Sequence, residues 1–205
     1  MWPGVQNCGT WARACMSCQR LKISRHITPL GDVALPTYWF QHVHVDIVCP
    51  LSTSDGSIHC PTAVDHFTHW LESISLPNIT AETVAKALLS GWITCFGCPQ
   101  TITTDQGRQF ESQLFHSLAV MCGINLSRTT AFHPAANGLV ERMHRSLRAA
   151  IMCRAQERWT KALPLVLGMR TAFKDLQASV SELVYGEPLR IPGELLAAPP
   201  TTGDP

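Results

Sequence analysis

The segment 80–105, TAETVAKALLSGWITCFGCPQTITTD, decides the fold because it combines one helix with the strand that follows it. A helix is predicted over 80–96, because apolar residues recur every three to four positions over 81–93, the period of a helix with one buried face. Gly97 is suited to end that helix, and the strand predicted over 101–104 leads into Asp105. We therefore expect a sheet covered by helices, with a carboxylate at one strand end.

The neighbouring segments extend this pattern in both directions. Residues 42–47, HVHVDI, alternate polar and apolar, as a half-buried strand does. Further strands are predicted over 57–65, 67–76 and 124–128, and helices over 110–122, for about 20 residues after 134–138, and over 159–173. Three adjacent strands followed by strands that alternate with helices indicate an α/β fold with a mixed sheet flanked by helices.

Composition narrows the class of protein. The 205 residues are 45% hydrophobic and 15% charged, which excludes a wholly disordered chain. No run approaches the roughly 20 apolar residues of a membrane span, and the first 20 residues lack the apolar core of a secretory signal, so we expect a soluble intracellular protein without a membrane partner. Residues 1–36 carry four basic and one acidic side chain, a weak indication of contact with a polyanion.

Three carboxylates stand where such a sheet would gather them. Asp46 lies inside the first predicted strand, Asp105 ends a later strand, and Glu141 opens the long helix. Converging carboxylates repel one another unless cations neutralise them. Hard oxygen ligands suit Mg²⁺ or Mn²⁺, and two such ions about 4 Å apart can activate an attacking oxygen and stabilise a leaving one at phosphorus.

Two segments around these carboxylates carry a resemblance. TTDQGRQF at 103–110 and HPAANGLVER at 133–142 resemble the signature segments of retroviral and retrotransposon integrases, TD-x-G-x-x-F and HP-x-x-NG-x-x-ER. HVHVDIVCPL at 42–51 looks like the first catalytic strand of that family. The stretches around 159–167 and 182–186 resemble the segment after the core in gypsy-type long-terminal-repeat retrotransposons.

The resemblance implies a ribonuclease H-like fold with a five-stranded mixed sheet. It also implies that Asp46, Asp105 and Glu141 bind two Mg²⁺ or Mn²⁺ ions and catalyse phosphoryl transfer. The family's reactions are trimming of the 3′ ends of linear element DNA and attack of those 3′-hydroxyls on target DNA. The resemblance also implies that the protein binds DNA, works as a homo-oligomer and is located in the nucleus.

Residues beside the carboxylates suit contact with DNA. Glu141, His144, Arg145 and Arg148 are spaced to share one helix face, which would put cations beside the metal-binding carboxylate and near a DNA phosphate. A solvated basic helix is the alternative explanation. The other face, Met143, Leu147, Ala150 and Ile151, is assigned to the core. The predicted DNA-binding set is His133, Asn137, Arg142, His144, Arg145 and Arg148; a structural role is an equal alternative for His133.

The cysteines raise the question of zinc. Cys15 and Cys18 have the spacing of half a zinc site, and the resemblance implies a His pair upstream of them. No His precedes Cys15, so we expect an N-terminally truncated remnant that does not hold stoichiometric zinc at these two thiols. Cys95 and Cys98, at a helix end, are predicted to pack. The expected domains are 1–36, this remnant and a linker; 37–165, the catalytic core; and 166–205, a helical extension with a disordered tail.

Some positions depart from the family pattern. Cys49 stands where the family usually has Gly, residues 167–181 look shortened, and Pro is absent before Glu182. These departures leave two alternatives to an active integrase. One is a ribonuclease H-like nuclease that uses only water as nucleophile, against which the segment after Glu141 argues. The other is a catalytically degenerate element-derived module that binds nucleic acid.

Overall fold

The structure is a computed structural model that describes residues 38–48, 51–128, 143–149, 158–163, 165–171 and 178–190, together with Ala14 and Ile151. Its strands are β1 His42–Val48, β2 Cys60–Asp65, β3 Leu71–Ser73, β4 Thr101–Thr104 and β5 Asn125–Arg128. Its helices are α3 Ala81–Leu88, the π-helix η1 Leu89–Ile93, α4 Thr94–Phe96, α5 Gln113–Cys122, the 3₁₀ helix η2 Trp159–Ala162, α7 Leu165–Thr171 and α8 Val180–Tyr185. Residues 143–149 are also helical.

The five strands form one mixed sheet in the order β3-β2-β1-β4-β5. β1 runs antiparallel to β2 and parallel to β4, and β5 continues the parallel side. This confirms the predicted five-stranded mixed sheet flanked by helices. The parallel pairs need crossover connections, which α3, η1 and α4 supply between β3 and β4, and α5 between β4 and β5.

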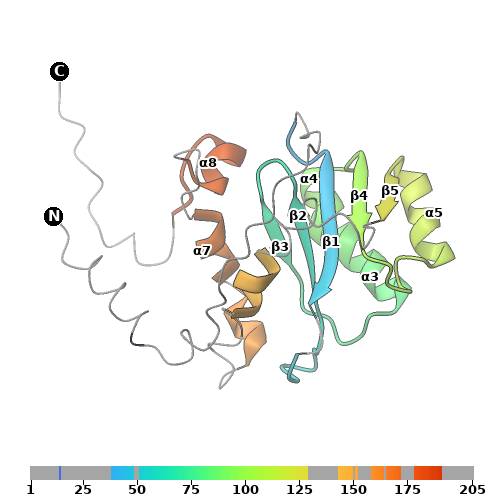
Figure 1. Cartoon of the computed structure of the whole chain (residues 1–205), viewed down its shortest axis with the longest axis horizontal. Coiled ribbons are helices and arrows are strands. Elements are labelled where there is room, and N and C mark those ends of the chain that lie inside the picture. The colour runs from blue at the N-terminus through green and yellow to red at the C-terminus, as the bar shows by residue number, and fades with distance from the viewer. Residues whose placement is uncertain are drawn as a thin grey trace, which may run out of the picture.

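The sheet has an apolar core on each face. Val43, Val45 and Ile102 pack with side chains of α3, η1 and α5, whereas Val64 and Leu71 pack with Leu147, Ile151 and Trp159. Figure 1 shows α3, α4 and α5 on one side of the sheet and the later helical segments on the other. Leu147 and Ile151 therefore occupy the core face predicted for the long helix, and Met143 packs at its margin.

The helix predicted over 80–96 is continuous but changes its pitch. Thr80 caps its start by accepting a hydrogen bond from the Thr83 N–H, and Gly97 ends it at φ 84°. Leu89–Ile93 winds as a π-helix, and the buried Trp92 lies within that stretch. Cys95 and Cys98 are exposed, so the prediction that they pack was wrong; the apolar face of the helix turns other side chains inward.

Several predicted boundaries were too generous because turns take up the strand ends. The second strand begins at Cys60 rather than 57, since Ser54 and Ser57 exchange two backbone hydrogen bonds around Asp55 (φ 45°) and Gly56 (φ 77°). Such a pair of positive φ angles is the two-residue hairpin turn that Asp-Gly favours. The third strand shortens to Leu71–Ser73 because the turn after β2 runs through Trp70.

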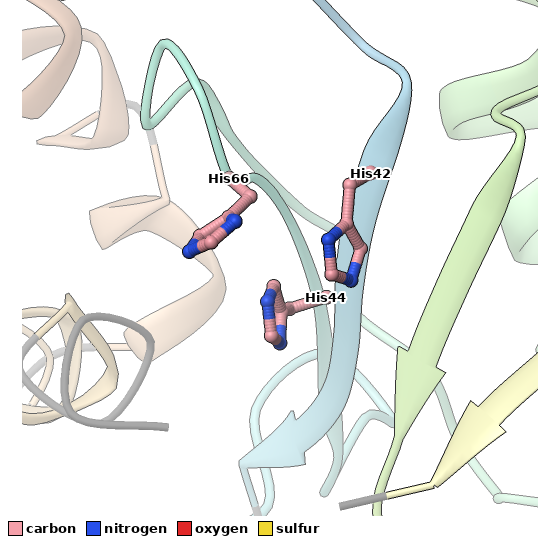
Figure 2. A group of neighbouring side chains, drawn as sticks. All are labelled: His42, His44 and His66. Atoms are coloured by element: carbon pink, nitrogen blue, oxygen red, sulfur yellow. The ribbon is translucent and has the colours of Figure 1, made fainter. Parts of the chain in front are cut away.

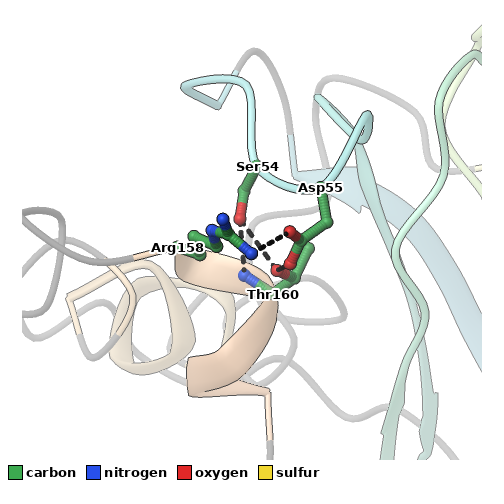
Figure 3. A network of polar contacts seen from close by, with 4 residues as sticks. All are labelled: Ser54, Asp55, Arg158 and Thr160. Carbon is green, nitrogen blue, oxygen red and sulfur yellow. Dashed lines mark hydrogen bonds and ion pairs between the residues drawn. The ribbon is translucent and has the colours of Figure 1, made fainter.

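A polar network ties this hairpin turn to η2 (Figure 3). Thr160 donates its hydroxyl to Asp55 Oδ2 at 2.6 Å, and its backbone N–H to Ser54 Oγ at 3.2 Å. Arg158 pairs with Asp55 Oδ1 at 3.0 Å, and the buried Trp159 donates its indole N–H to the Ser52 carbonyl at 2.6 Å. Side chains more than 100 residues apart in sequence thus join the β1–β2 turn to the C-terminal helical segment.

The other predicted helices differ in their details. α5 begins at Gln113 because Ser112 caps it, and it buries Phe115 and Ala119, while Leu114 and Met121 are exposed. The helix predicted over 159–173 is η2 followed by α7 in the described residues. α8 was not predicted as a separate helix, although Ser179 and Glu182 form the capping box that could have located it.

Candidate active site

Asp46 stands on the central strand of the sheet, on the same face of β1 as His42 and His44 by the alternation of a strand. Its carboxylate accepts a hydrogen bond from the Ile47 N–H at 2.7 Å through Oδ1. Oδ2 lies 2.9 Å from Nδ1 of His144, on the helical segment 143–149. The side chain is 40% exposed, so a ligand can reach it from solvent.

His144 connects the helical segment 143–149 to two neighbouring strands, β1 and β2. Its Nε2 lies 2.5 Å from the Thr62 hydroxyl, and Thr62 is the residue directly opposite Asp46 on β2. The imidazole thereby bridges neighbouring positions of β1 and β2. Both ring nitrogens have partners inside the chain; the predicted contact of His144 with DNA stays a prediction.

The surroundings of Asp46 favour its ionised form. Burial raises the pKa of this carboxyl, but the hydrogen bond and charge of His144, the Ile47 N–H and the charge of Arg148 together hold the pKa below its usual value. Arg148 and Arg145 are exposed on the helical segment, as the predicted basic face requires. Basic side chains thus lie near Asp46. Their positive charge favours the ionised carboxylate, which burial alone would disfavour.

Asp105 directly follows β4, the strand that pairs with the Asp46 strand β1. β1 and β4 are parallel with Val45 opposite Thr104, so Asp46 and Asp105 are the next residues on the two neighbouring segments. Adjacent strands lie roughly 4.8 Å apart. Asp105 is exposed, and its Oδ1 accepts the Gly107 N–H at 3.0 Å, which closes a tight turn.

Gly107 lies close to the side chains of Asp105 and Gln109. A Cβ at position 107 would come within 2.9 Å of Asp105 Oδ1 and 2.3 Å of the Gln109 side chain. Gly107 does not have a positive φ. The hydrogen bond from its N–H holds the Asp105 carboxylate next to the end of β4.

Other predicted site residues lie outside the part of the chain that the structure describes. These are Glu141, His133, Asn137 and Arg142, and the two thiols Cys15 and Cys18. Their roles stay predictions. Among the described residues, Asp46 and Asp105 each directly follow an opposed pair on β1 and β4, and His144 connects Asp46 to the helical segment 143–149.

A second group of ligand-type side chains was not singled out from the sequence. His42, His44 and His66 offer nitrogen atoms that all lie within 4.8 Å of one another (Figure 2). The alternation His42-Val43-His44-Val45-Asp46 could have indicated two of them, because it places both imidazoles on the face of Asp46. His66 joins them only through the antiparallel pairing of β1 and β2, which no local pattern reveals.

The same fold occurs in known integrases. A solved structure of the simian T-cell lymphotropic virus intasome in complex with PP2A regulatory subunit B56 gamma matches with a TM-score of 0.65 and 21% identity, over 93% of this chain and 69% of that one. The catalytic core domain of BIV integrase matches with a TM-score of 0.59 and 20% identity, over 70% and 93%. The ribonuclease H-like fold predicted from the resemblance is therefore confirmed.

The family model described as Integrase core domain matches residues 38–134. Residues 38–134 are thus similar in sequence to an integrase core domain. The Gag-Pol polyprotein of walleye dermal sarcoma virus is 31% identical over 166 residues, 78% of this chain and 9% of that protein. The Retrovirus-related Pol polyprotein from transposon 412 of Drosophila melanogaster is 33% identical over 121 residues, 58% of this chain and 10% of that protein.

This integrase-type core spans about a tenth of the length of these two polyproteins. The resemblance to retroviral and retrotransposon Pol proteins is thus confirmed. Among the described residues, no helix is long and apolar enough to cross a membrane.

Proposed function

We propose that this chain is the catalytic part of an integrase that trims the 3′ ends of element DNA and joins them to target DNA. The observation that carries the proposal is the parallel register of β1 and β4, in which Asp46 and Asp105 each directly follow the opposed pair Val45 and Thr104, in a segment similar to an integrase core domain. Both reactions are displacements at phosphorus, in which a protein contributes chiefly position and charge.

Glu141 is proposed as the third carboxylate. It precedes His144 by three residues, and residues three apart in a helix share a face. His144 is bonded to Asp46, which supports placing that helix face against the two aspartates. The signature segment 133–142 gives independent support from the sequence.

The donor set of Asp46 and Asp105 fits a divalent cation. Integrase core domains generally use divalent metal ions, and carboxylate oxygens are the ligands that Mg²⁺ and Mn²⁺ prefer. Asp46, Asp105 and Glu141 would hold two such ions, which supply Lewis acidity at the scissile phosphate. The hydrogen bonds from His144 and the Ile47 N–H and the charge of Arg148 favour the ionised form of Asp46, and His144 orients its carboxylate from the protein side.

DNA would lie along the exposed basic face. Arg145 and Arg148 stand on the helical segment beside Asp46, and their cations would fix the phosphate backbone without reading sequence. Arg142, His133 and Asn137 are proposed to extend this surface. A structural neighbour is an intasome, which supports a homo-oligomer on DNA as the working assembly, and integration into chromosomal DNA implies a nuclear location.

The test is the product formed by the purified full chain with Mg²⁺, a labelled 3′-hydroxyl oligonucleotide of the element end and a circular target. An integrase joins the label covalently to the circle. A nuclease that uses water alone nicks the circle and leaves the label free. A degenerate module binds both DNAs, which shifts them in a gel, but cuts and joins neither. Either the nuclease result or the degenerate-module result would overturn the proposal.

A further inference from the structure

We propose that His42, His44 and His66 bind one transition-metal cation, Zn²⁺ or an ion of similar ligand preference, at a site separate from the aspartates. Three observations carry the proposal: the convergence of the three imidazoles, the unpartnered nitrogens among them, and the polar contacts that fix the surrounding turn. It does not depend on the proposed strand-transfer activity.

The sheet itself brings the three rings together. His42 and His44 project from the same face of β1, and His66 reaches over from the turn after β2 (Figure 2). Ring centroids are 4.8 Å apart for His42 and His44, 5.1 Å for His42 and His66, and 5.2 Å for His44 and His66. One nitrogen from each ring lies within 4.8 Å of the other two.

Two of these imidazoles have buried nitrogens without a hydrogen bond. His44 is 4% exposed and His66 is 9% exposed. Nε2 of His44 and Nδ1 of His66 have no hydrogen-bond partner among the described residues. Buried polar atoms are nearly always paired, because an unpaired one loses its hydration without compensation. A cation shared by the rings would satisfy both nitrogens at once.

The neighbouring contacts hold the rings for such a ligand. Nε2 of His42 lies 2.7 Å from the Thr103 hydroxyl on β4, so Nδ1 is the nitrogen left for a cation. A ligating imidazole is commonly fixed in this way through its second nitrogen. Asp65, which precedes His66, accepts hydrogen bonds from the N–H groups of Phe40 and Thr68 and from the Thr68 hydroxyl. Its carboxylate therefore stabilises the turn and is not proposed as a ligand.

The geometry requires a short closing movement. Tetrahedral zinc with bonds of about 2.0 to 2.1 Å places its ligand nitrogens about 3.4 Å apart. The nitrogens lie within 4.8 Å of one another, and rotation of the imidazole rings is the movement that the proposal requires to bring them to that spacing. Three imidazoles are a common ligand set for Zn²⁺, and water or an anion would complete the tetrahedron.

The consequence would be a tie between the strand that bears Asp46 and the turn after β2. His44 is two residues from Asp46 on the same strand face, so a cation on His44 and His66 restrains β1 next to the proposed catalytic carboxylate. The role inferred is structural, and the Mg²⁺ chemistry at Asp46 and Asp105 is not routed through it.

Co²⁺ is the probe, since it binds where zinc does and reports its ligands by visible absorption. The full chain carrying Cys15→Ser and Cys18→Ser is freed of metal and titrated with Co²⁺. With excess Mg²⁺ present to occupy the proposed carboxylate site, we expect one cobalt ion per chain, visible d–d bands and no thiolate-to-cobalt charge-transfer band. Zinc should then displace the cobalt and raise Tm by about 5 to 10 °C at a free concentration a hundred times Kd.

His44→Gln and His66→Gln should each lose the d–d bands and the Tm rise. His116→Gln, on α5 away from the cluster, and Asp105→Asn, at the other proposed metal site, should keep both. Circular dichroism of the metal-free variants checks folding, and His66→Gln serves if His44→Gln does not fold. Lack of uptake, a thiolate charge-transfer band, or binding that survives His66→Gln would overturn the proposal.

Discussion

At the scale of single residues, burial of imidazoles beside one another sets the ionisation of the histidine cluster. Burial, with the charges of His42, His66 and His144, lowers the pKa of His44 to about 3. Burial also lowers the pKa of His42 and of His66, with Asp65 opposing the effect. The native state thus keeps these rings neutral where the unfolded chain binds protons.

The sign of the pH dependence comes from this difference. Between about pH 6.5 and pH 3 the unfolded state carries the His44 proton and the native state does not, so stability rises with pH in this window and levels off above it. We predict that protonation of His44 in the unfolded state lowers the unfolding free energy by about 1.4 kcal/mol when the pH falls from 7.5 to 5.5. Urea unfolding at both pH values, with a chelator present, measures it.

The variant comparison isolates the residue. On going from pH 7.5 to pH 5.5, the unfolding free energy of His44→Gln should fall by about 1.4 kcal/mol less than that of the parent. The unfolding free energy of His116→Gln should fall by as much as that of the parent. Equal losses in the parent and in His44→Gln would show that the buried ring does not carry the pH dependence.

At the scale of elements, the order of strands and helices could be read from the sequence, but the ends of elements could not. The periodicity over 81–93 reports a helix with a buried face, and the alternation over 42–47 reports a half-buried strand, because both patterns repeat locally. The loss of strand at 57–59 depends on the turn Asp55-Gly56, and the division of 159–173 into η2 and α7 depends on contacts with distant residues. Local patterns contain no information on those contacts.

The network at the β1–β2 turn provides a test at this scale. Thr160→Val removes a hydroxyl that donates to Asp55 and lies 2.8 Å from the buried Ser54 hydroxyl. We predict a loss of about 1 to 2 kcal/mol of unfolding free energy, because polar partners are left without their bond. Thr94→Val, whose exposed hydroxyl bonds to the helix backbone at Ser90, should change it by less than about 0.5 kcal/mol. Similar losses in the two variants would contradict the role of the network.

At the scale of the whole molecule, the sheet brings together residues that are far apart in sequence. The signature segments and the strand pattern predict that Asp46 and Asp105 share one site, and the parallel register of β1 and β4 is consistent with that prediction. The bridge from His144 to Asp46 and Thr62 could not be predicted, because it depends on how the long helix crosses β1 and β2. His66 was missed for the same reason: its partners are 22 and 24 positions away along the chain and adjacent only through strand pairing.

The proposed DNA surface is a property of this assembled face. We predict that Arg145→Ala with Arg148→Ala weakens binding to unrelated duplexes equally, and lowers the slope of log K against log salt by about 0.9 for each lost phosphate contact. Filter binding or fluorescence anisotropy over a salt series measures the slope. Lys86→Ala is the matched control, because Lys86 lies on α3 on the opposite side of the sheet and pairs with Glu82 at 2.6 Å. A slope that the double variant leaves unchanged would contradict the surface.

The measurement that tests the central claim most directly is the strand-transfer rate of Asp105→Asn beside that of the parent chain, with Mg²⁺. Asparagine keeps the oxygen that accepts the Gly107 N–H, and position 105 is exposed, so Tm without metal should not fall. If Asp105 holds a catalytic cation, transfer should drop below detection while the variant stays folded. A folded Asp105→Asn chain that joins DNA at the parental rate would contradict the claim that Asp46 on β1 and Asp105 after β4 belong to the catalytic centre.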